Sequence, residues 1–298
     1  MEIMSTRTSL AAAVSVSALA LVGLAGCGEE EPTRPSSADT TEASDPAAAD
    51  ATDEPSPDAP ATTTVPVYFV GDTPQGPRLY REFRQVGSDN PAAEALALMT
   101  AGDALDPDYR SLYPEGQFAD VEITDSAITV ALPDESWSLP VEGQSDEDAR
   151  LAAQQLAYTL QGIAQARTPI SVTLDGQPAD LFGLGGELSN EPELDVRALV
   201  NVTAPAEGAK VGDTFTAEGV SSSFEATTPW EVRDADGTVV KEGFATAEGW
   251  MDKLYPWSSE VDVSDLPAGE YTFVARTDDP SDGEGAGPTE DSKTIIVS

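Results

Sequence analysis

The side chains that most often perform chemistry are scarce in this sequence of 298 residues. It contains no histidine and a single cysteine, Cys27. Without histidine, the serine–histidine and cysteine–histidine mechanisms and every histidine-ligated metal site are excluded. One cysteine also excludes an intramolecular disulfide and any multi-cysteine zinc or iron–sulfur centre. Chemistry would have to come from carboxylates, lysines or glycine-rich loops.

Carboxylates are abundant, with 54 acidic residues against 15 basic ones. Counting alone leaves open a pair of carboxylates suited to glycoside hydrolysis. Most of the acids, however, fall in expected turns and helix starts, where solvation accounts for them. No lysine follows a serine at the spacing of a Ser-x-x-Lys nucleophile. We therefore expect no catalytic residues and no enzymatic activity.

Glycine-rich segments at residues 183–186 and 283–287 complete neither a dinucleotide fingerprint nor a phosphate loop. The acidic residues within 278–284 cluster as calcium ligands do, but Pro280 breaks the EF-hand spacing. The pattern leaves calcium binding open and favours a solvated acidic loop. We expect neither a metal nor a cofactor.

A net charge of −39 argues against nucleic acid as a partner, because binding a phosphate backbone needs a cationic face. Locally, Arg78, Arg81 and Arg84 lie within seven residues and alternate with Tyr80 and Phe83. They are a candidate strip for lipid headgroups, wall polymers or an acidic partner. The alternative, which we favour, is charge protection of an edge strand.

Trp250, Tyr255 and Trp257 form a second candidate contact surface. Aromatic side chains at this density could stack on sugars or anchor a protein interface. The alternative, again favoured, is that they belong to the core of a β-sandwich.

The N-terminus has the organisation of an export signal. Arg7 precedes an apolar run at residues 10–25 that is too short and too rich in serine and alanine for a transmembrane helix. The run ends in Leu24, Ala25, Gly26 and Cys27. These four residues resemble the lipobox of bacterial lipoprotein precursors. The resemblance implies a signal peptide at residues 1–26 and acyl chains, such as palmitate, anchoring Cys27 to the outer face of the cytoplasmic membrane. The alternative is an ordinary secretory signal with an incidental cysteine.

Residues 27–64 are expected to form a lipid-anchored, unstructured tail rich in acids, proline and alanine. Between residues 28 and 64 there is no Leu, Ile, Val, Met, Phe, Tyr or Trp. Such a segment buries too little apolar surface to offset the entropy lost on ordering. It would lift the folded domains off the membrane; slack without a selected length is the alternative.

A first folded domain is expected at residues 65–188. Apolar or alternating runs predict strands, and capping residues ahead of apolar residues at helical spacing predict helices. We expect strands at 67–70, 79–86, 120–124, 127–132 and 170–174, with helices opening near residues 91 and 145. This order predicts an α+β domain with two helices on one side of a mixed sheet.

A longer pattern runs through this domain. It comprises Asn90, Pro91, Ala95, Leu96, Leu98 and Gly102, then Leu112, Pro114 and Gly116, and the strand that ends at residues 172–176. The pattern resembles the GerMN family of sporulation and spore-germination domains, and departs from it at residues 100–103, where relatives more often have a Gly-Pro pair. The resemblance implies a non-enzymatic, extracytoplasmic module similar in fold to ring-building domains of envelope assemblies.

A polar linker is expected at residues 189–194, followed by a second domain at residues 195–298. Seven short alternating strands without a helical stretch predict an all-β, antiparallel, immunoglobulin-like sandwich. Residues 234–237 are expected to turn between two of these strands, and Tyr271 to bond back to the backbone as a corner tyrosine. Because the linker lacks large apolar residues, we expect a small, polar contact and separable domains.

Residues 223–225, the turn, residues 267–271 and the acidic loop at 279–287 resemble the immunoglobulin-like GerM-associated (Gmad) domain. The succession of lipobox, tail, GerMN and Gmad implies a non-catalytic surface lipoprotein that binds or assembles in a Gram-positive-type envelope. Two alternatives stay open: a regulatory accessory of a membrane sensor or wall-remodelling enzyme, and a wall-polysaccharide binder. We expect a protein partner in the envelope, with self-association as a further outcome.

Overall fold

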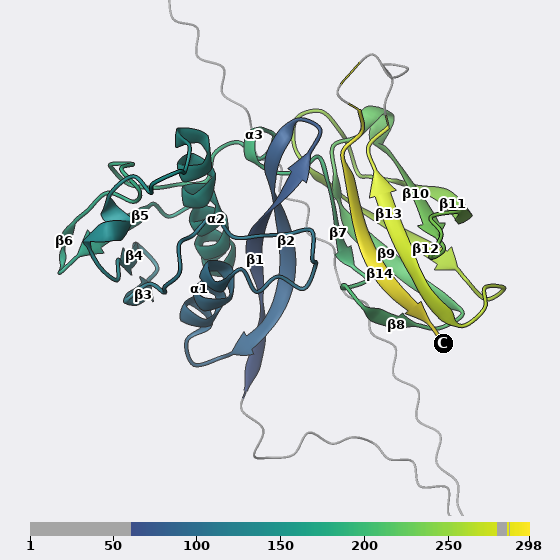
Figure 1. Cartoon of the computed structure of the whole chain (residues 1–298), viewed down its shortest axis with the longest axis horizontal. Helices are drawn as coiled ribbons and strands as arrows, with labels where there is room; N and C mark the ends of the chain where they lie inside the picture. Colours follow the sequence, from purple (N-terminus) through teal and green to yellow (C-terminus); the bar gives the residue numbers. More distant parts are fainter. Residues whose placement is uncertain (1–60, 279–284, 286) are drawn as a thin grey trace, which may run out of the picture. The chain divides into compact units, whose positions relative to one another are not determined.

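The computed structural model describes residues 61–278, 285 and 287–298 (Figure 1). The expected signal peptide at 1–26, with the lipobox residues Leu24, Ala25, Gly26 and Cys27, lies outside these residues. The expected tail lies outside them up to residue 60, and so does the acidic loop from residue 279 to 284.

The first element is a long antiparallel hairpin of strands β1 (Thr62–Thr73) and β2 (Gly76–Gly87). From residue 67 to 71, β1 is buried on both faces: Phe69, opposite Tyr80, contributes to one hydrophobic cluster, and Val70, opposite Leu79, to another. β1 begins three residues before the expected domain boundary. Residues 62–64 are ordered because they pair with residues 85–87 of β2, which supply backbone partners that the sequence of the tail does not reveal.

Helices α1 (Pro91–Ala101) and α2 (Asp146–Ala164) begin where the capping residues predicted. The Asn90 side chain accepts a hydrogen bond from the backbone N–H of Ala93. At α2, Ser145 and Asp148 bond to each other's backbone N–H in a reciprocal capping box. α2 is buried on nearly all sides from residue 149 to 161, which is unusual for a helix that covers one face of a sheet.

The burial of α2 follows from its place between two sheets (Figure 1). On one side lies the β1–β2 hairpin. On the other is a mixed four-stranded sheet of β3 (Asp120–Ile123), β4 (Ile128–Ala131), β5 (Ile170–Leu174) and β6 (Gln177–Pro178), in which β4 and β5 are parallel. The α+β fold is confirmed. The arrangement with helices on one side of a single sheet is wrong, because β1 and β2 form a sheet of their own.

The segment expected as a free polar linker is held against α2. The Gln154 amide donates to the Ser189 carbonyl, and the Gln161 carbonyl accepts from the Asn190 N–H. Arg150 pairs with Glu191, just before the short helix α3 (Glu193–Val196). These bonds tie the linker's backbone groups to α2, so its polar composition does not make it flexible.

The second domain is an immunoglobulin-like sandwich. A five-stranded sheet has the order β11-β10-β13-β14-β8, and a three-stranded sheet has the order β12-β9-β7. Their bounds are β7 (Val200–Ala204), β8 (Ala209–Val211), β9 (Thr214–Ser221), β10 (Thr227–Arg233), β11 (Val239–Thr246), β12 (Tyr255–Asp262), β13 (Gly269–Arg276) and β14 (Glu290–Val297). β8 is additional to the seven expected strands, and it runs parallel to β14.

Two local predictions for this domain are confirmed. Asp234 closes the turn between β10 and β11: its carboxylate accepts from the N–H groups of Asp236 and Thr238. The Tyr271 hydroxyl donates to the carbonyl of Pro267 at 2.9 Å, which makes it a corner tyrosine.

Candidate functional site

The three arginines of the candidate strip lie on a strand, and this separates them. All belong to β2, in which successive side chains point to opposite faces. Arg78 and Arg84 therefore share one face, and Arg81 lies on the other. A spacing of three residues would have aligned them on a helix, but on a strand it cannot.

Each arginine is also engaged within the chain. Arg84 pairs with Glu82 at 3.3 Å and with Asp103 at 3.5 Å. Burial lowers the pKa of the Arg81 guanidinium, which lies 4.6 Å from the centre of the Phe83 ring. Arg78 donates to the neighbouring Pro77 carbonyl. These contacts make no continuous basic strip.

The aromatic candidates are divided as well. Trp257 is only 4% exposed and belongs to the sandwich core, as the favoured alternative predicted. Tyr255 is half-buried, and its hydroxyl donates to Asp252 at 2.9 Å. Trp250 is half-buried too, with its ring 5.0 Å from that of Phe224. Trp257 is therefore removed from any contact surface.

The most perturbed cluster of ionisable groups lies where the two domains meet, and it contains none of the predicted site residues. Its centre is Lys293 on β14, 4% exposed, whose ammonium donates to Tyr109 Oη at 2.8 Å and to Asp291 Oδ1 at 3.2 Å. The same ammonium is bonded to the carboxylate of Asp106. Tyr109 and Asp106 belong to the first domain, whereas Lys293 and Asp291 belong to the second.

A second tier of hydrogen bonds holds these groups in place. Asp291 Oδ2 accepts from the Val202 N–H at 2.6 Å and from the Asn201 amide at 3.0 Å. The side-chain oxygen Oδ1 of Asn201 accepts from the backbone N–H of Arg81 at 2.8 Å. Several of these bonds cross between the domains.

On the side of the first domain, Glu82 fixes the loop that carries Asp106. Its carboxylate accepts from the backbone N–H groups of Leu105 and Asp106, both at 2.9 Å. Arg84 offsets the charge of Glu82, which is itself 7% exposed. The buried carboxylate of Glu82 therefore orients a loop.

Electrostatics in this network follow from burial and from opposite charge. Burial raises the pKa of the Asp106 carboxyl, although the Lys293 ammonium opposes the shift. Burial alone would lower the pKa of Lys293, but Asp291 and Asp106 outweigh it and raise that pKa. Burial, with Asp291 and Asp106 adding to it, raises the pKa of Tyr109 well above its ordinary value.

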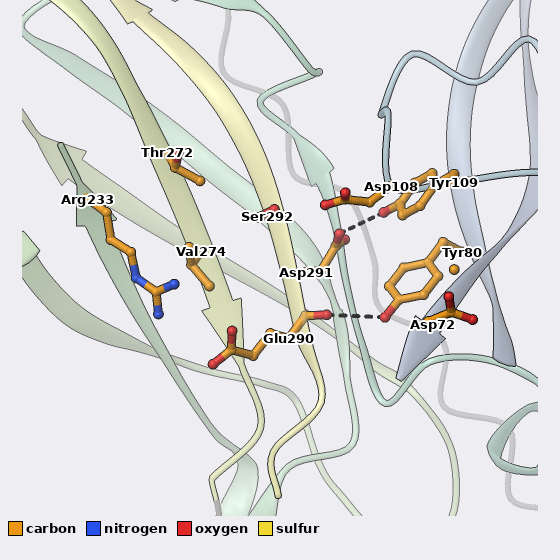
Figure 2. Close-up of a pocket in the computed structure, with 11 residues that line it drawn as sticks. Asp72, Tyr80, Asp108, Tyr109, Arg233, Thr272, Val274, Glu290, Asp291 and Ser292 are labelled. Carbon is orange, nitrogen blue, oxygen red and sulfur yellow. Dashed lines mark hydrogen bonds between the residues drawn. The ribbon is translucent and has the colours of Figure 1, made fainter. Parts of the chain in front are cut away.

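A cleft of about 390 Å³ opens beside the network (Figure 2). Tyr80 and Tyr109 extend from the first domain towards β14, where the Tyr80 hydroxyl donates to the Glu290 carbonyl at 3.1 Å and the Tyr109 hydroxyl to Asp291 at 2.7 Å. Perturbed groups beside a cleft are typical of active sites, but buried ion-pair networks produce the same shifts. Here Asp106, Tyr109, Asp291 and Lys293 are bonded to one another.

In the part of the chain that the structure describes, no three or more His, Cys, Asp or Glu residues are grouped so as to hold a metal ion. Among residues 61–278, 285 and 287–298, no helix is long and apolar enough to cross a membrane.

Two family models match the chain in succession. Residues 66–180 match the Germane family, described as "Sporulation and spore germination", and residues 199–284 match Gmad2, "Immunoglobulin-like domain of bacterial spore germination". The chain therefore contains a GerMN domain, the type of domain that the Germane model describes, followed by a Gmad2 domain. In these terms, Tyr109 and Asp106 of the network lie in the GerMN domain, whereas Asp291 and Lys293 lie on β14 of the sandwich, beyond the matched Gmad2 range.

Solved structures similar to the chain include the tandem GerMN domains of the sporulation protein GerM from Bacillus subtilis. That match has 14% identity and a TM-score of 0.35, and it covers 69% of this chain and 63% of the other. A Jonesia denitrificans lytic polysaccharide monooxygenase has 19% identity over 32% of this chain and 60% of its own, with a TM-score of 0.21. The C-terminal domain of wzt has 16% identity over 30% and 63%, with a TM-score of 0.22. The chain thus spans less than two thirds of each. No curated protein matches the sequence.

Proposed function

We propose that the protein is a non-catalytic lipoprotein, anchored through Cys27 to the outer face of the cytoplasmic membrane, which binds a protein partner in the bacterial envelope. The two matched families, both described by sporulation or spore germination, support a role in that setting. Residues 24–27 support the anchor, because their order resembles a lipobox.

The observation that carries the binding role is the buried network around Lys293. It joins the GerMN and Gmad2 domains through side chains that are 2–4% exposed at Asp106, Asp291 and Lys293. Such a joint holds the surfaces of the two domains at a fixed separation and orientation. A binding or assembly module benefits from that rigidity, because less conformational freedom is lost when it docks.

The geometry favours protein over sugar as the ligand. Stacking on a sugar calls for exposed rings that share a plane. Trp257 is in the core, and the rings of Trp250 and Phe224 meet at 80°. A regulatory accessory of a membrane sensor or wall-remodelling enzyme would also bind a protein. This alternative therefore differs only in the identity of the partner.

The anchor is tested with Cys27→Ser in the producing cell and a fatty-acid probe. We expect loss of label and an uncleaved precursor, while Ser17→Ala, in the same apolar run, keeps both label and processing. Unchanged labelling of Cys27→Ser would contradict the anchor.

The binding role is tested by capture from solubilised membranes, with residues 28–298 as bait and its Lys293→Met variant, in which the joint between the domains is weakened, as the matched control. We expect a defined partner to be retained by the wild-type bait and retained less by the variant. Release of products from peptidoglycan fragments by the purified bait would contradict the non-catalytic role.

A further inference from the structure

We propose that Phe224, Trp250 and Met251, here called the aromatic patch, form a docking surface for a basic polypeptide segment that carries apolar side chains. The inference rests on the proposed binding function and names the chemistry of the partner. It concerns a face of the Gmad2 domain that the Lys293 network does not use.

The patch brings two loops of the sandwich together. Phe224 belongs to the short helix η2 (Phe224–Ala226) between β9 and β10, and Trp250 and Met251 belong to the loop between β11 and β12. The rings of Phe224 and Trp250 pack edge to face with centres 5.0 Å apart. The Met251 N–H donates to the Ser222 hydroxyl at 3.1 Å, which ties the second loop to the first.

These side chains are presented outwards. Phe224 is 39% exposed and Met251 is 68% exposed, while Trp250 is half-buried against the core. Trp, Phe and Met are the residues that protein interfaces favour. An apolar cluster left in water beside a complete core marks a contact surface.

The backbone beneath the patch is strained. Six non-glycine residues in the described chain have a positive φ, and three of them lie here: Glu225 at 53°, Ala226 at 60° and Met251 at 82°. Hydrogen bonds impose this conformation, since the Ala226 N–H donates to the Ser223 carbonyl and the Ala226 carbonyl accepts from the Ala247 N–H. Strain of this kind gathers at functional surfaces, where the fold holds side chains in a conformation they would not choose.

Charge around the patch indicates the partner. The exposed acids Glu225, Glu248 and Asp252 adjoin the patch in sequence, and exposed Asp278 is bonded through its N–H to the Ser223 hydroxyl at 2.7 Å. Lys253 is the neighbouring base, and its ammonium lies over the Tyr255 ring. An apolar centre with an acidic rim complements a segment with apolar anchors and basic flanks.

The same charge disfavours the other occupants. A second copy of the chain would bring together two molecules that each carry a net charge of −39. Anionic lipid and anionic wall polymer would meet the acidic rim with like charge, which is repulsive. A basic polypeptide is attracted by both the rim and the whole molecule.

The test measures anisotropy of a labelled amphipathic peptide of alternating Lys and Leu, with a Glu–Leu peptide as the control ligand and residues 28–298 as the protein. We expect the Lys–Leu peptide to bind, the Glu–Leu peptide not to bind, and added salt to weaken binding. Phe224→Ser and Met251→Asn should each raise Kd about tenfold; asparagine tolerates the positive φ of Met251.

Three further variants keep the test specific. Phe244→Ser removes an aromatic side chain that is more exposed than Phe224, at 66% on β11, and should bind as the wild type does. Glu225→Lys with Asp252→Lys should weaken binding while the fold, checked by circular dichroism, is unchanged. These exposed charges leave the core intact, so the test does not depend on substituting Trp250.

Several outcomes would overturn the inference. They are no binding of the Lys–Leu peptide, equal loss for Phe244→Ser and Phe224→Ser, tighter binding to phosphatidylglycerol vesicles than to the peptide, or dimers in sedimentation that Phe224→Ser abolishes. Failure of this inference can be distinguished from failure of the proposed binding function. A membrane partner captured equally by Phe224→Ser would leave the binding role standing and remove only this surface.

Discussion

The ammonium of Lys293 and the hydroxyl of Tyr109 are hydrogen-bonded at 2.8 Å although the two residues belong to different domains. Both side chains are buried, and both also bond to Asp291. A buried ion held by partners from two domains couples them, because separating the domains would break its bonds to Asp106 and Tyr109.

Lys293→Met should lower the free energy of unfolding by about 3–5 kcal/mol, since it leaves Asp106 and Asp291 buried without a counter-charge. Urea denaturation followed by circular dichroism measures the change. The matched control is Lys241→Met, which breaks the pair with Asp265, 71% exposed, and should cost much less. Equal losses for the two variants would show that the buried network is energetically ordinary.

Calorimetry should show one cooperative transition for residues 61–298. The described residues all belong to one compact unit of the chain, and this revises the expectation of freely separable domains. In Lys293→Met the transition should broaden or split as the domains uncouple. The expectation from the linker composition would be restored if fragments 61–198 and 199–298 each melted as they do in the intact chain.

Alkaline pH should destabilise the fold. Burial raises the pKa of Tyr80, Tyr109, Tyr113 and Tyr158 above the ordinary 10.0, and the nearby carboxylates raise that of Lys293 above 10.5 despite burial. The folded state then holds more protons than the unfolded state above pH 10. The free energy of unfolding is therefore full below pH 10 and falls as the pH rises through the folded-state pKa values.

This alkaline transition is measured by tyrosinate absorbance and circular dichroism on the same samples. We expect most of the absorbance change to coincide with loss of structure. A smooth titration centred near the ordinary value of 10.0, with the circular dichroism unchanged, would contradict the burial of these hydroxyls.

Tyr271→Phe should lower the free energy of unfolding of the chain by about 1 kcal/mol, because it leaves the Pro267 carbonyl without its tyrosine donor. Tyr255→Phe is the matched control: it removes a hydroxyl bonded to Asp252 at the surface, where water replaces the bond. Denaturant midpoints of the two variants give the comparison. Indistinguishable midpoints would argue that the corner bond contributes nothing.

Local bonds made much of this fold readable from the sequence. The helix starts at Asn90 and Ser145, the turn at Asp234 and the corner at Tyr271 each depend on partners within a few residues. The succession of an α+β domain and a sandwich followed from periodicity, and the family matches agree with it.

Other features could not be read in this way. Arg78, Arg81 and Arg84 form no single strip, because the alternation of strand β2 places Arg81 on the opposite face from the other two. β1 and β2 form a sheet of their own because α2 lies between them and the other strands of the domain. Hydrophobic periodicity predicts strands but does not predict which strands share a sheet. No pattern in the sequence indicated that Arg81, Asn201 and Asp291 lie close together.

Composition and short-range contacts were enough to predict the main helices and strands, the helix caps and turns, and the exclusion of histidine and disulfide chemistry. The tertiary structure alone decided that Lys293 meets Asp106 across 187 residues of chain. A buried charge needs an opposite charge and hydrogen-bond partners. Because these come from distant parts of the chain, the sequence around Lys293 does not predict its role.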